Sequence, residues 1–105
     1  MAVVTVSTYT VKPDRYDDFL ADARKAKALL QKHGAKNVRV MAALVAGEAT
    51  GSVASIVEAD DWAASGAFND RFQADPEGQA LLASLSSGAS PIGAANVSIW
   101  VDVPL

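Results

Sequence analysis

Apolar and polar residues alternate in three parts of the chain, at residues 2–11 (AVVTVSTYTV), 37–46 (NVRVMAALVA) and 95–103 (ANVSIWVDV). Alternation with a period of two, in runs rich in β-branched residues, is typical of strands that bury one face. Residues 52–59 (SVASIVEA) have a similar composition between turn residues. The pattern therefore predicts four strands.

A helical period follows the first strand. We predict a helix from about Arg15 to His33, because apolar residues spaced by three and four share one of its faces: Tyr16, Phe19, Leu20, Ala23, Ala26 and Leu30. Asp14 and Asp17 resemble a capping pair at its start, and Gly34 can adopt the positive φ that often ends a helix.

A second helix is predicted after Asp60 and Asp61, where negative charge favours a helix start. One arc of this helix contains Trp62, Ser65, Phe68, Asn69 and Phe72. Asp75 followed by Pro76 then predicts the start of a third, short helix, whose apolar residues are Leu81, Leu82 and Leu85. We expect a loop at residues 86–93.

The predicted order is βαββαβ, in one domain over residues 1–105, with a hairpin loop at GEATG between the second and third strands. Right-handed crossovers would put both long helices on the same face of a four-stranded antiparallel sheet. The expected fold class is therefore α+β, ferredoxin-like.

The other face of this sheet would be bare. Alternation assigns the Val4/Val6 and Val38/Val40 pairs to the helix side, and it assigns the following residues to the bare face: Val3, Tyr9, Val11, Met41, Val45 and Trp100. A soluble monomer rarely exposes so apolar a patch, and a second copy of the same face is always available to cover it. We expect a homodimer through this face, with Trp100, Tyr9 and Met41 at or near the interface.

Composition excludes several kinds of function. The 105 residues have a net charge of −3 and no basic cluster, so neither nucleic acid nor a membrane surface is an expected partner. The absence of cysteine and the single histidine argue against a Cys- or multi-His-ligated metal centre. We predict a cytoplasmic protein with no metal and no cofactor.

Several segments together resemble a known superfamily: the helix entry VKPDRYDDF, the helix exit HGAKNVRV, the hairpin AGEATG, and an aromatic second helix followed by DPEG. The chain resembles the dimeric α/β-barrel superfamily of ferredoxin-like proteins. It is most similar to the NIPSNAP-like and antibiotic-biosynthesis-monooxygenase-like branches. The resemblance implies a dimeric α/β barrel, with sites between sheet and helices or inside the barrel.

Members of this superfamily include cofactor-free monooxygenases, haem-degrading enzymes, lactone isomerases and polyketide cyclases. A haem-binding relative would offer a proximal histidine from the second half of the chain, which has none here. Monooxygenase relatives carry Asn and Trp around the substrate cavity, and the corresponding residue types here are Asn69 and Trp62. The resemblance thus implies a cofactor-independent site if the protein is an enzyme.

Each candidate ligand-binding residue also has a structural interpretation. Asn69 could point its amide at a ligand, or with Ser65 it could satisfy nearby backbone groups. Trp62 could form a pocket wall or cover apolar area in the packing. His33 has the pKa range of a general base, but at a helix C-terminus a capping or exposed role is favoured.

Tyr9 and Arg39 lie on strands, and alternation places both on the bare face with Met41 and Trp100. If that face lines a cavity, a phenol and a guanidinium there could bind an anionic or phenolic ligand. Alternatively, Arg39 could pair with Glu58 or Asp102 across a dimer interface.

Three functions remain open from the sequence. The first is a small homodimeric protein that binds a small apolar or aromatic molecule between sheet and helices. The second is a cofactor-independent monooxygenase or isomerase acting on a quinol- or polyketide-like substrate. The third is a structural or interaction module whose barrel is filled. No residue is assigned a catalytic role.

Overall fold

The computed structural model describes residues 1–105, except for the side chain of Ala49. Its elements follow the predicted βαββαβ order, with a split second helix: β1 (Val3–Val11), α1 (Tyr16–Lys32), β2 (Lys36–Ala42), a 3-10 turn η1 (Gly47–Ala49), β3 (Val53–Ala59), α2 (Trp62–Ala74), α3 (Pro76–Leu85) and β4 (Ile92–Val101). None of the helices that the structure describes is long and apolar enough to cross a membrane.

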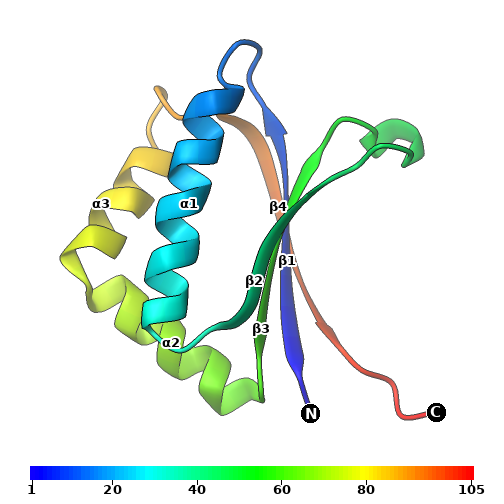
Figure 1. Ribbon diagram of the computed structural model, residues 1–105, viewed down its shortest axis with the longest axis vertical. Helices are drawn as coiled ribbons and strands as arrows, with labels where there is room; N and C mark the ends of the chain where they lie inside the picture. The colour runs from blue at the N-terminus through cyan, green and yellow to red at the C-terminus, as the bar shows by residue number, and fades with distance from the viewer.

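The four strands form one antiparallel sheet in the order β2-β3-β1-β4. Figure 1 shows the helices together on one side of this sheet, while its other side has no helix against it. The predicted ferredoxin-like α+β fold, with one covered face, is therefore confirmed.

The face assignment on β1 was wrong. Val3 is almost completely buried, and the Tyr9 ring lies 5.9 Å from the ring of Phe19 on α1, so the odd-numbered residues of β1 face the helices. Val4 and Val6 consequently point to the bare face. Alternation alone could not decide, because valines occupy both sets of positions on this strand. On β2 the prediction was right, since Val38 is buried against Phe68 of α2.

The helix ends agree with the predicted end signals except at the start of α1. Asp61 accepts a hydrogen bond from the backbone N–H of Ala64 at 2.7 Å, and Asp75 accepts one from Glu77 at 2.9 Å. Gly34 has φ +105°, as expected beyond a helix end. At the start of α1, however, the N-cap residue is Arg15, and no side chain caps this end of the helix. Asp14, the predicted cap, lies in the preceding turn and has φ +63°.

Two strand boundaries differ from the prediction by three or more residues. β2 ends at Ala42, four residues early, because the chain leaves the sheet plane to form a longer hairpin extension. β4 begins at Ile92, three residues early, because Val11 and Thr10 pair with Ile92 and Ala94.

The core lies between the sheet and the helices in two clusters. The first joins the sheet to α2 and consists of Ala35, Val38, Ala59 and Phe68. The second joins the three helices through Leu29, Phe72 and Leu81. Phe68 and Phe72 therefore face inward as predicted, and the α2–α3 pair is fixed to α1 by the second cluster.

The corner between α2 and α3 is packed around Gly78. A Cβ atom added there would lie 2.0 Å from the backbone oxygen of Phe72, which is far inside van der Waals contact. Gly66, in the middle of α2, has no atom within 4 Å of the same position. The two helical glycines therefore have opposite requirements.

We predict that Gly78→Ala destabilises the protein by about 3 kcal/mol, because the backbone of the corner must move to admit the methyl group. Gly66→Ala should instead stabilise it by roughly 0.5–1 kcal/mol through helix propensity. Urea unfolding of both variants measures the difference. Equal effects of the two substitutions would contradict the packing at this corner.

Candidate functional site

A cavity of about 50 Å³ lies between the sheet and α1, closed at one end by α3. Its walls are mainly apolar, and the apolar residues come from β1, β2, β4, α1 and α3: Tyr9, Phe19, Ala23, Ala26, Leu30, Val38, Val40, Leu85 and Ile92. Two larger hollows are open surface grooves, one between α1 and α3 and one at the β2 edge of the bare face. The cavity beneath α1 is also partly open to solvent, and residues of all four strands line it.

The sheet side of this cavity includes the small residue Ser55 of β3, whose cross-strand partner on β2, Val40, also lines it. Serine fills much less space than the valine or isoleucine typical of such a position, so it leaves part of the gap beneath α1 open. A serine at a helix-facing position of a central strand was therefore the sequence signal for this cavity.

Polar groups enter the cavity at a few points. The hydroxyl groups belong to Tyr9 and Ser55, and charged side chains come from Asp22 and Lys27 on α1. Among the described side chains, no buried polar atom lacks a hydrogen-bond partner, and no three His, Asp or Glu side chains group as metal ligands do. The arrangement suits an apolar group with one hydrogen-bonding substituent.

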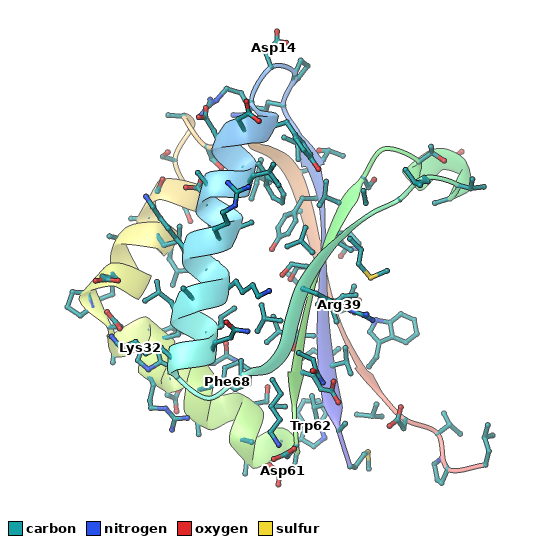
Figure 2. All side chains as sticks on the ribbon, viewed as in Figure 1. Asp14, Lys32, Arg39, Asp61, Trp62 and Phe68 are labelled. Carbon is teal, nitrogen blue, oxygen red and sulfur yellow. The ribbon has the colours of Figure 1, made fainter. Side chains whose placement is uncertain are left out.

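Only Tyr9 of the seven candidate residues lines the cavity. The three candidates on α2 lie elsewhere: Asn69 donates from Nδ2 to the backbone oxygen of Ser65 at 2.9 Å, so its amide is bound to its own helix. Ser65 is buried in the packing, while Trp62 at the start of α2 is 59% exposed. Figure 2 shows Trp62 near the end of the helix layer, beside Asp61.

The remaining candidates lie on the bare face. Arg39 points away from the helices in Figure 2, and its cross-strand partner is Ile56. Met41 follows two residues later on the same side, and Trp100, 62% exposed, pairs with Val4. The hypothesis that Tyr9 and Arg39 share one face was therefore wrong, because they lie on opposite sides of the sheet.

A polar junction joins the three helices, and sequence reasoning did not find it. His33, which ends α1, donates from Nε2 to Asp75 Oδ2 at 2.9 Å, and Lys32 reaches the same oxygen at 3.3 Å. Arg71 donates to the backbone oxygen of His33. His33 was predicted to be a cap or exposed, and its partner lies 42 residues away, where no local pattern could indicate it.

The junction perturbs the ionisation of Asp75. The hydrogen bond from His33, the backbone N–H of Glu77 and the charge of Lys32 stabilise the carboxylate, and together they lower the pKa of Asp75 to about 2. Asp75 also ends α2 and caps α3. These contacts join the ends of α1 and α2 to the start of α3.

Comparison with known proteins gives a result at the level of fold. No family model matches the sequence, and no curated protein matches it. Solved structures do match. A NIPSNAP family protein from Agrobacterium tumefaciens superimposes with a TM-score of 0.75 at 14% identity, over 97% of this chain and 86% of that chain.

A second NIPSNAP family protein from that organism, described as having unknown function, gives a TM-score of 0.72 at 14% identity, over 94% of this chain and 86% of its own. The fold is that of NIPSNAP family proteins. A NIPSNAP domain protein from Burkholderia xenovorans agrees, with a TM-score of 0.68 at 17% identity, over 96% of this chain and 94% of its own. The predicted resemblance to NIPSNAP-like proteins is thus confirmed for the fold.

The helix junction predicts a pH dependence. The pKa of Asp75 is lower in the folded protein than its ordinary value of 3.8, so the carboxylate stabilises the fold fully above that value, and this contribution is lost as the pH falls towards 2. Asp75→Asn keeps a capping side chain but removes the charge. We expect this variant to unfold at a lower temperature than wild type at pH 5, with the difference shrinking steadily towards pH 2.

The matched control is Asp70→Asn, which removes a carboxylate from an exposed position on α2. Thermal unfolding of both variants followed by circular dichroism measures the effect. A difference between wild type and Asp75→Asn that stays constant from pH 5 to pH 2 would mean that the charge of Asp75 does not support the junction.

Proposed function

We propose that this protein is a homodimer that binds a small apolar or aromatic molecule in the cavity between its sheet and helices. The observation that carries the binding role is the cavity itself, which lies beside Ser55 between the sheet and α1. Protein interiors are normally close-packed, so a gap lined by both apolar walls and hydroxyl groups suits an occupant.

The size of the cavity restricts this occupant. A volume of about 50 Å³ has room for a few water molecules or for one edge of an aromatic ring. The ligand would therefore insert one apolar end beside Tyr9 and Phe19 and leave a polar end near Asp22 and Lys27. A single-ring compound or a short alkyl chain with one polar substituent fits this description.

The bare face supports the proposed dimer. Its central rows combine apolar residues of all four strands: Val4, Val6, Met41, Ala54, Ile56 and Trp100. A two-fold axis through such a face makes every contact twice. Arg39 and Glu58 add one charge of each sign, so the face is electrostatically self-complementary, and Asn37 orients the Glu58 carboxylate by a hydrogen bond of 2.7 Å.

Binding in the cavity can be tested with indole and phenol as probes. We expect each probe to change the amide NMR shifts of cavity residues such as Val40, Ser55 and Ile92, while the bare face stays unchanged. Ala23→Phe places a ring into the cavity and should abolish these changes. Ala21→Phe adds the same ring to an exposed position on α1 and should preserve them.

Shift changes that persist in Ala23→Phe, or that appear on the bare face, would contradict this site. A folded wild type that responds to neither probe and carries no small molecule in native mass spectrometry would instead favour a filled, structural module.

The dimer can be tested independently. Sedimentation equilibrium at micromolar concentration should give about twice the chain mass of 10.9 kDa. Trp100→Asp should shift the protein to monomer, because a charge would be buried in the interface. Leu82→Asp, a similar change at an exposed residue of α3, should leave the dimer intact. Wild type that remains monomeric, or a dimer insensitive to Trp100→Asp, would refute the proposed face.

A further inference from the structure

The hairpin between β2 and β3 extends beyond the sheet as a built structure, the hairpin arm (residues 43–52). Its base is closed by two backbone hydrogen bonds of 2.9 Å, from Ala43 to Ser52 and from Gly51 to Ala43. Its tip is fixed by the hydroxyl of Thr50, which accepts from the backbone N–H of Ala46 at 3.0 Å. The positive φ of Gly51 turns the chain back into β3.

This ordered arm holds two large apolar side chains in solvent. Leu44 is 83% exposed and Val45 is 95% exposed. Hairpin tips are usually polar, so two apolar side chains at this position are unusual. The hydrogen bonds of the arm hold its backbone in a defined turn, in which no other part of the protomer covers these side chains. Two adjacent exposed apolar residues on an ordered projection indicate a contact with another surface.

The direction of the arm indicates which surface. In Figure 1 the arm bends to the side of the sheet opposite the helices, so it rises at one end of the bare face. Met41, exposed on that face, leads directly into it. A body that covers the bare face would therefore meet the arm as well.

We propose that the hairpin arm clasps a second copy of this chain, with Leu44 and Val45 packed on the partner beyond the shared sheet face. This inference rests on the proposed dimer. The charge of the arm favours a protein surface over an anionic membrane, because Glu48 is its one charged residue and it has no Lys or Arg.

The first test compares two leucine substitutions by sedimentation equilibrium of the full chain. Leu44→Gln should raise the dimer dissociation constant by about tenfold or more, because two buried leucines are lost per dimer. Leu82→Gln makes the same change on α3, outside the proposed contact, and should match wild type. Both residues are exposed in the protomer, so the fold should be retained, and circular dichroism checks this.

The second test uses the absence of native cysteine. In the Val45→Cys variant, the thiol should react with iodoacetamide more slowly as protein concentration rises and dimer forms. The thiol of Leu82→Cys should react at one rate throughout.

The outcomes separate the two proposals. The clasp is overturned, while the dimer remains, if wild type dimerises and Leu44→Gln and Leu82→Gln have the same dimer dissociation constant. The same conclusion follows if the thiol of Val45→Cys reacts at a rate that does not depend on protein concentration. Wild type that is monomeric at all concentrations overturns both. A third outcome is that wild type binds phosphatidylserine vesicles, Leu44→Gln does not, and both proteins have the same dimer mass. This outcome also overturns the clasp, and it assigns the arm to a membrane.

Discussion

A sheet whose two helical crossovers return on the same side can be covered by its own chain on one face only. In this protein α1, α2 and α3 all lie on that side, and none of the described helices packs on the other. Every main feature of the molecule follows from this asymmetry. The core and the cavity lie on the helix side, and the exposed apolar residues of the bare face are the basis of the proposed dimer.

The helix side combines tight and loose packing. The α2–α3 corner admits no side chain at Gly78, and the junction around Asp75 fixes the ends of all three helices. The region over Ser55 is less filled, and the proposed binding cavity lies there, between α1 and the sheet.

Much of the fold could be predicted from the sequence, because periods of 2 and 3.6 mark the elements directly. The β1 face could not, since Val3 and Tyr9 on one side are as apolar as Val4 and Val6 on the other, and only the contact with Phe19 decides. The roles of the candidate site residues also depended on contacts in the folded protein that the sequence pattern does not show. Asn69 lies on the predicted arc but bonds its own helix, and the His33–Asp75 pair joins residues too distant for a local pattern.

The proposed dimer places a second copy of the chain over the bare face. Trp100 reports on it directly, since it is 62% exposed in the protomer and Trp62 is the other tryptophan. In a Trp62→Phe variant, quenching of Trp100 fluorescence by acrylamide should be strong at low protein concentration and should weaken, with a blue-shifted emission, as dimer forms. Strong quenching of Trp100 that persists in a sample with dimer mass would mean that the second copy does not cover the bare face.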